Sequence, residues 1–231
     1  MIGINGKPYI DLDPYLDIEG FKSLHADICQ GIAVARPFAK EGTWIQPTYD
    51  LSFASYNDNR KTIYDAYQEF KNLDDTHPLK IAGDQLQDKN EIVRFLKTAF
   101  GANDPYIYYH IWDGKERKFF LSVIEWIRSI NIVDRVHYAT LLLCEHNHRP
   151  FEHQDLGNME HREFIHLRSD LSRGFYVWDE EQKKKHYVES YSAWWNEQDW
   201  HGGDVSNKQE YSLRIDCSFT EEFKRSIYET N

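Results

Sequence analysis

The chain has 231 residues, of which 41% are hydrophobic, 15% aromatic and 28% charged, a profile typical of a folded globular protein. The formal net charge of −11 argues against a basic surface, so we expect no nucleic-acid partner. Three widely spaced cysteines without a CxxC pair indicate a reduced, cytoplasmic protein. No signal peptide and no membrane span are expected, because no apolar run is long enough.

Amphipathic helical patterns lie in the first 130 residues. In 58–72, Ile63, Tyr67 and Phe70 recur at spacings of four and three, which is the spacing of one helix face. Segments 89–100 and 117–130 show the same pattern. We therefore predict a mixed, helix-rich N-terminal part over 1–130.

After residue 130 the chain becomes rich in short segments with β-branched and aromatic residues. They are 136–146, 163–168, 174–179, 185–190 and 211–219. Short strands at close intervals, separated by polar turns, favour a jelly roll over a parallel sheet. The predicted fold is mainly β with N-terminal helices (α+β), with a double-stranded, cupin-like β-helix over 131–220. Nothing divides 1–231 into independent domains.

The stretch RPFEHQDLG places His153 two residues before Asp155. Residues at this spacing share one face of a strand, so one metal ion can contact both. His25 and Asp27 have the same spacing, but their apolar neighbours follow a helical pattern, so we exclude that pair.

A second histidine from a distant strand would complete a metal site with His153 and Asp155. The best candidate is His201 in WWNEQDWHGGD, where the following glycines are expected to turn the backbone tightly. Two histidines and one carboxylate on one face of an octahedral ion are diagnostic of non-haem Fe(II) oxygenases.

Arg214 belongs to EYSLRIDCSF, in which apolar and polar residues alternate. On the polar face of such a strand, the arginine faces either solvent or the inside of the barrel. Inside, it needs an anion, and a carboxylate can bind a guanidinium through two hydrogen bonds. Outside, Asp216 would be a sufficient partner.

HQD (153–155), WHGG (200–203) and LRID (213–216), in this order and spacing, resemble the 2-oxoglutarate/Fe(II)-dependent dioxygenases. The resemblance spans about 136–220. It is closest to the aspartyl/asparaginyl β-hydroxylase-like group, through FIHLRS (164–169), the VWDEE turn and the Trp195–Asn196 pair. Asp216 departs from the pattern, because many members have serine there.

The resemblance implies Fe(II) held by His153, Asp155 and His201, with 2-oxoglutarate held by Arg214 and His166. It implies hydroxylation of an unactivated C–H bond by dioxygen, with release of succinate and CO2. The expected substrate is a small polar molecule, such as a free amino acid or a derivative. A peptidyl Asp or Asn side chain is the alternative.

A rival metal site overlaps the first. His146, His148 and Glu152, with His201, resemble a cupin site that would need no 2-oxoglutarate. The glycine that cupins carry before the first histidines and the Pro-x-Gly before the last one are absent, and the rival site gives Arg214 no reason to face inward. A jelly-roll binding protein with no enzymatic activity is a third possibility, and it would retain no Fe(II).

Overall fold

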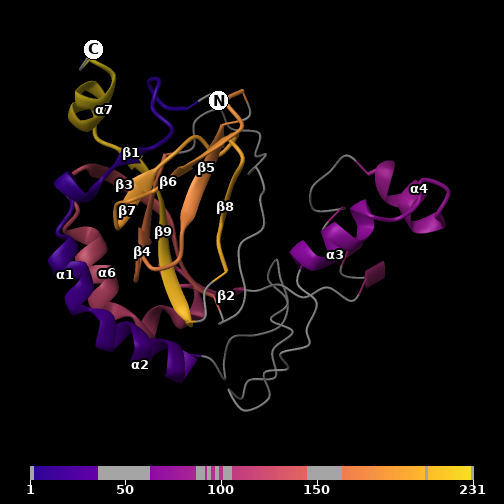
Figure 1. Ribbon diagram of the computed structural model, residues 1–231. Coiled ribbons are helices and arrows are strands. Elements are labelled where there is room, and N and C mark those ends of the chain that lie inside the picture. The colour runs from indigo at the N-terminus through magenta and orange to yellow at the C-terminus, as the bar shows by residue number, and fades with distance from the viewer. Residues whose placement is uncertain are drawn as a thin grey trace.

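The computed structural model describes residues 3–35, 63–86, 92, 95, 96, 99, 100, 106–144, 163–179, 181–205 and 208–229. Within this part of the chain, nine strands form two antiparallel sheets (Figure 1). The strands are β1 (Ile10–Asp11), β2 (Tyr106–His110), β3 (Val133–Cys144), β4 (Phe164–Arg168), β5 (Phe175–Asp179), β6 (Lys184–Tyr187), β7 (Ser192–Trp194), β8 (His201–Gly203) and β9 (Glu210–Phe219).

The larger sheet has the order β1-β7-β4-β9-β3-β2, and the smaller one β6-β5-β8. Every strand pair in both sheets is antiparallel. The mainly β, jelly-roll fold class is therefore confirmed. The five segments predicted as strands correspond to β3, β4, β5, β6 and β9.

The described α-helices are α1 (Ile18–Ser23), α2 (His25–Ala35), α3 (Ile63–Lys71), α4 (Pro78–Asp84), α6 (Leu121–Arg128) and α7 (Glu221–Tyr228). Two 3-10 turns lie at Asp13–Tyr15 and Lys115–Phe119. Helices α1, α2 and α6 cover one face of the larger sheet, and the smaller sheet lies on its other side (Figure 1). None of the described helices has the length and apolarity that crossing a bilayer requires.

Strand β9 connects these layers. Its odd-numbered residues are buried, and they belong to the same apolar core as Phe21, Ile28 and Ile127 of the covering helices. The even-numbered residues, Arg214 among them, point to the opposite face, toward the smaller sheet. The alternation predicted for 211–219 is confirmed, because a two-residue period separates the two faces of a strand.

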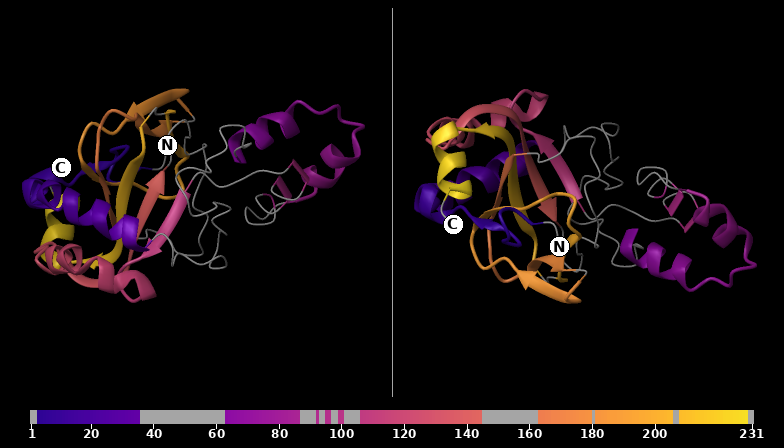
Figure 2. Two further views of the ribbon diagram at one scale, coloured as in Figure 1. Left: turned by 90° about the horizontal axis from the view of Figure 1, so that it is seen from below. Right: turned by 90° about the horizontal axis from the view of Figure 1, so that it is seen from above.

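The N-terminal part is less uniform than its helical patterns indicated. The predicted helices at 58–72 and 117–130 are present as α3 and α6, whereas most of 89–100 lies outside the described residues. Strand β2, which the periodicity did not reveal, pairs with β3 at the edge of the larger sheet. Helices α3 and α4 stand apart from the sheets in every view (Figure 2). They have a separate apolar cluster around Ala66, Phe70 and Leu96.

Truncation of a β9 core residue tests this packing. Leu213 is fully buried, whereas Leu121 on α6 is 57% exposed. We expect Leu213→Ala to lower the free energy of unfolding by about 2–5 kcal/mol, because the truncation leaves a cavity. Leu121→Ala, the matched control, should change it by less than about 1 kcal/mol. Urea denaturation measures both, and equal losses would contradict this assignment of the core face.

Candidate functional site

His201 is buried on β8, with 3% of its surface exposed. Its Nδ1 atom lies 2.9 Å from the backbone carbonyl oxygen of Asp199. A carbonyl can only accept a hydrogen bond, so Nδ1 carries the proton and Nε2 carries the lone pair. Histidines that bind metals are held in the same way, with the other ring nitrogen donating to a carbonyl or carboxylate.

The glycines after His201 do not form the tight turn that we expected. Gly202 and Gly203 continue strand β8, opposite Tyr176 and Phe175 of β5. Strand pairing requires an extended backbone, and both glycines are buried in it. The turn lies before His201 instead.

Trp195 joins the two sheets around His201. Its ring centroid lies 5.4 Å from that of His201 and 4.7 Å from that of Phe175, which belong to the smaller sheet. On the larger sheet it lies 5.2 Å from His166 and 4.7 Å from Phe164. The two histidines of the predicted site, His166 and His201, therefore contact opposite parts of one aromatic cluster.

His166 lies on β4, directly opposite Arg214 of β9. The residue is partly exposed, and its ring packs against those of Phe175 and Trp195, at centroid distances of 5.5 and 5.2 Å. Burial, followed by the charges of Arg168, Arg214 and His201, lowers the pKa of His166 to about 3. His166 is therefore neutral near pH 7, so it can take part in hydrogen bonds but adds no positive charge.

Arg214 faces the space between the sheets, where its guanidinium lies 4.2 Å from the centre of the Phe164 ring. Asp216 Oδ1 accepts hydrogen bonds from Arg214 Nε at 3.1 Å and from Nη2 at 2.9 Å. Glu197 accepts a further short one from Nη2. Of the two orientations considered from the sequence, the structure shows the inward one. The partner expected for the outward one, Asp216, nevertheless pairs with the arginine.

No motif in the sequence distinguishes Glu197 from the other acidic residues. It is 8% exposed and belongs to the turn between β7 and β8, which is closed by a 2.9 Å hydrogen bond from Asp199 N to Asn196 O. The Asn196 side chain accepts from Gln198 N at 3.0 Å, a pattern that favours asparagine as the first turn residue. The pairing of Glu197 with an arginine 17 residues later is a tertiary contact, which no local pattern predicts.

Two buried donors near this cluster have no acceptor among the described residues. They are Nε1 of Trp195 and Nδ2 of Asn196, in side chains that are 2% and 4% exposed. Buried N–H groups are nearly always hydrogen-bonded. Together with the proton position on His201, they make this region suited to a metal ion and an oxygen-rich ligand.

The other predicted ligands cannot be placed. His153 and Asp155 lie outside the described residues, as do His146, His148 and Glu152 of the rival site. Within the described part, no three His, Cys, Asp or Glu side chains converge on a possible metal position. The structure therefore describes only the His201, His166 and Arg214 part of the predicted site.

Arg168 and Trp194, two buried residues of the larger sheet, have structural roles. Arg168 is buried, and it donates to the carbonyl oxygens of Arg173, Val188 and Ser190 at 3.1, 2.6 and 2.8 Å. Trp194 is 1% exposed and belongs to the main core. Neither side chain faces solvent at a pocket entrance.

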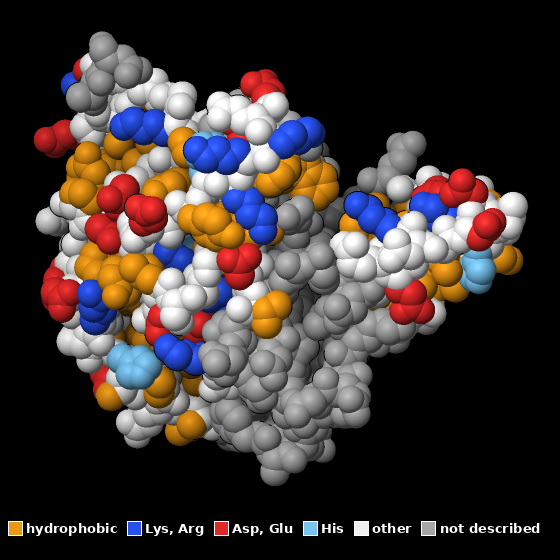
Figure 3. Space-filling model, in the orientation of Figure 1, with side chains coloured by type: hydrophobic (Ala, Val, Ile, Leu, Met, Phe, Trp, Pro, Cys, Tyr) orange, Lys and Arg blue, Asp and Glu red, His pale blue; other side chains and the backbone are white. Residues whose placement is uncertain are grey.

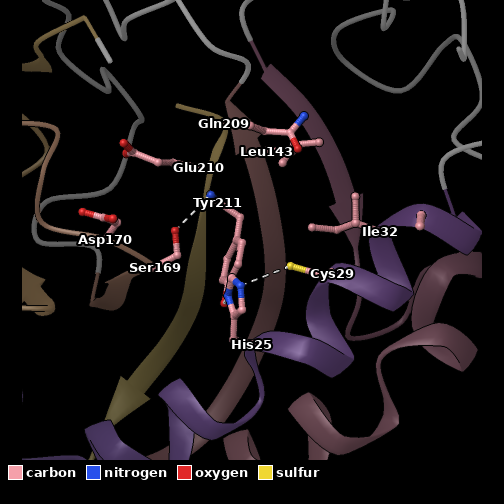
Figure 4. Close-up of a pocket in the computed structure, with 10 residues that line it drawn as sticks. His25, Cys29, Ile32, Leu143, Ser169, Asp170, Gln209, Glu210 and Tyr211 are labelled. Atoms are coloured by element: carbon pink, nitrogen blue, oxygen red, sulfur yellow. Dashed lines mark hydrogen bonds between the residues drawn. The ribbon is translucent and has the colours of Figure 1, made fainter. Parts of the chain in front are cut away.

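A cavity of about 310 Å³ lies elsewhere, between α2 and the start of β9 (Figure 4). In it, the His25 ring lies between Tyr211 and Cys29, with Nδ1 3.0 Å from Tyr211 Oη and Nε2 3.6 Å from Cys29 Sγ. Tyr211 is on the helix-facing side of β9, so this cavity is separate from the Arg214 side. The predicted helical setting of His25 and Asp27 is confirmed, because both lie on α2.

On the face shown in Figure 3, the coloured Lys and Arg side chains are interspersed with Asp and Glu.

No family model matches the chain, and no curated protein matches its sequence. Among solved structures, it is similar to a prolyl hydroxylase from Trichoplax adhaerens, in complex with a hypoxia inducible factor oxygen degradation domain fragment. The TM-score is 0.47 at 8% identity, over 96% of this chain and 87% of that one.

Two further similarities are weaker. A prolyl-4-hydroxylase from Pseudomonas putida gives a TM-score of 0.32 at 10% identity, over 49% of this chain and 70% of that one. An RmlC-like cupin from Desulfovibrio desulfuricans gives 0.26 at 13%, over 37% and 80%. Similarities this distant assign no chemistry to the chain.

The low pKa of His166 makes stability depend on pH. Between the unfolded pKa of about 6.5 and the folded value of about 3, the unfolded chain binds a proton that the folded chain does not. The free energy of unfolding should therefore fall as pH falls below 6.5. We expect a smaller fall in His166→Gln than in the wild type. Urea denaturation of metal-free protein at pH 7.5 and pH 5 measures the change in the free energy of unfolding for both proteins. An identical change in the wild type and in His166→Gln would contradict the expectation.

Proposed function

We propose that the chain is a non-haem Fe(II)- and 2-oxoglutarate-dependent dioxygenase that hydroxylates a small polar substrate, releasing succinate and CO2. His153, Asp155 and His201 would hold Fe(II), and Arg214 would pair with the C5 carboxylate of 2-oxoglutarate beside His166. The observation that carries the proposal is the His201 hydrogen bond to Asp199, which holds the ring in the way that metal-binding histidines are held.

Fe(II), when bound, would supply the activation of dioxygen that hydroxylation of a C–H bond needs. The protein contributes position and surroundings. The carbonyl of Asp199 holds the His201 ring in one tautomer, and Trp195 packs against it. The aromatic cluster around Trp195 limits the access of water, which strengthens charge interactions near Arg214.

The inward orientation of Arg214 supports this proposal over a cupin-type site. Arg214 is partly buried and pairs with Asp216 and Glu197, and its inward guanidinium could bind an oxoglutarate carboxylate in the same way. The cupin set of His146, His148, Glu152 and His201 gives it none.

The proposed substrate is a free amino acid or a related small molecule. The resemblance to the aspartyl/asparaginyl β-hydroxylase-like group favours a peptidyl Asp or Asn side chain as the second candidate. Succinate formation with Fe(II), ascorbate and 2-oxoglutarate, measured against panels of amino acids and peptides, separates the two. An absence of succinate with every member would count against the enzyme class.

Removal of His201 tests the metal site. His201→Ala should weaken Fe(II) binding on the order of 100-fold or more and abolish succinate formation, because one of three protein ligands is lost. His153→Ala should do the same. His25→Ala is the matched control, since its ring is engaged by Tyr211 on the other side of β9, and it should retain both properties. Full activity in His201→Ala would remove this residue from the site.

A double variant, His146→Gln with His148→Gln, distinguishes the metal site of an oxoglutarate enzyme from a cupin-type metal site. In an oxoglutarate enzyme it should bind metal almost as the wild type does, whereas Asp155→Ala should bind metal poorly. The reverse pattern in a metal titration would establish the cupin ligands instead. A wild-type protein that retains no Fe(II) would favour the binding protein without activity.

A further inference from the structure

We propose that Glu197 occupies, on Arg214, the place of the cosubstrate carboxylate, and that 2-oxoglutarate binds by exchange with it. The inference rests on the proposed function and adds a step to it. In the structure, Arg214 is already paired, because Glu197 and Asp216 both accept hydrogen bonds from its guanidinium. A third carboxylate would therefore enter a group of charges that is already anionic.

The charges of this group are simple to count. Of the three side chains joined by these contacts, Arg214 contributes +1, and Glu197 and Asp216 contribute −1 each, so the three sum to −1. The side chains are only 17%, 9% and 11% exposed, so water screens their interactions weakly. A carboxylate of the cosubstrate that approaches Arg214 would be repelled by Glu197 and Asp216, and this repulsion is smaller once one of them leaves.

Glu197 is the carboxylate that can leave. Asp216 lies two residues from Arg214 on the same face of a central strand, and its backbone pairs with β3 and β4 on either side. It contacts both Nε and Nη2 of Arg214. Glu197 reaches Arg214 from a turn, through a longer side chain, and accepts from Nη2, whereas Asp216 accepts from both Nε and Nη2. Rotation of this side chain removes the contact without disturbing a strand.

Exchange keeps the charge of the group unchanged. When the C5 carboxylate of 2-oxoglutarate replaces Glu197, Arg214 again has two carboxylate partners. The exchange costs the free energy of the Glu197–Arg214 contact. The apparent dissociation constant for 2-oxoglutarate is therefore the intrinsic one divided by the fraction of molecules in which Arg214 is accessible. Glu197 would thus set how much 2-oxoglutarate the protein needs.

The test is the equilibrium affinity for 2-oxoglutarate, measured by calorimetry without oxygen and with Mn(II) in place of iron. Glu197→Gln keeps the shape of the side chain and removes its charge, so it should bind 2-oxoglutarate about tenfold more tightly than the wild type. Glu197→Asp keeps the charge but shortens the reach, and it should bind with intermediate affinity. Arg214→Gln should bind about 100-fold more weakly.

Glu210→Gln is the matched control. Glu210 is also a shielded carboxylate paired with an arginine, since its side chain is 10% exposed and its Oε2 lies 3.5 Å from Arg173 Nε. It lies four residues from Arg214 on β9, which is about 13 Å along an extended strand. Its removal should leave 2-oxoglutarate affinity unchanged. A tightening equal to that of Glu197→Gln would indicate a general charge effect and overturn the inference.

The remaining outcomes separate this inference from the proposed function. If Glu197→Gln and Glu197→Asp bind 2-oxoglutarate no more tightly than the wild type, while Arg214→Gln loses binding, Glu197 is not a competitor and the inference fails alone. If Mn(II) binds but neither the wild type nor any variant binds 2-oxoglutarate, the proposed function fails and the inference fails with it. Should Glu197→Gln not fold, Glu197→Asp decides between these outcomes.

Discussion

The arrangement of this protein depends on the two faces of strand β9. One face supplies Leu213 and Ile215 to the core beneath the helices, and the other presents Arg214 to the space between the sheets. Because successive side chains point to opposite faces, a shift of one residue would place the guanidinium in the apolar core. The burial of the odd-numbered residues therefore also determines where the charged group of the candidate site lies.

A charge enclosed between two sheets must be compensated, and here the chain supplies the compensation itself. Asp216 and Glu197 accept hydrogen bonds from the Arg214 guanidinium. Partly buried charges of this kind contribute little net stability, because their desolvation offsets most of the attraction between them. The same contacts are an obstacle to an anionic ligand. The carboxylates that compensate the charge of Arg214 would thus also compete with the proposed cosubstrate.

The fold was predictable where a pattern was long enough to have a period. The alternation in β9 and the helical spacing in α3 and α6 predicted all three elements. Strands β7 and β8 have three residues each, too few for a period to be recognised. The glycines of β8 were predicted to form a turn, because glycine is common in turns and the sequence does not show which strands are neighbours. In the structure, these glycines pair with β5 and are extended.

The candidate site was predictable only in part, for a related reason. His201, His166 and Arg214 were chosen by residue type and order along the chain, and their proximity follows from the pairing of β4 with β9 and from the contacts of Trp195. Glu197 is one of 38 acidic residues, and no local pattern distinguishes it. Its role depends on a tertiary contact.

The N-terminal segment also acts on the site through a tertiary contact. Gly3 N donates to Asp199 Oδ2 at 2.7 Å, and the backbone carbonyl of the same aspartate holds the His201 ring. Gly3 has a φ of 62°, and a Cβ there would lie 2.5 Å from the carbonyl oxygen of Lys7, so this contact requires glycine. A segment nearly 200 residues from His201 in the chain thus supports the orientation of the proposed metal ligand.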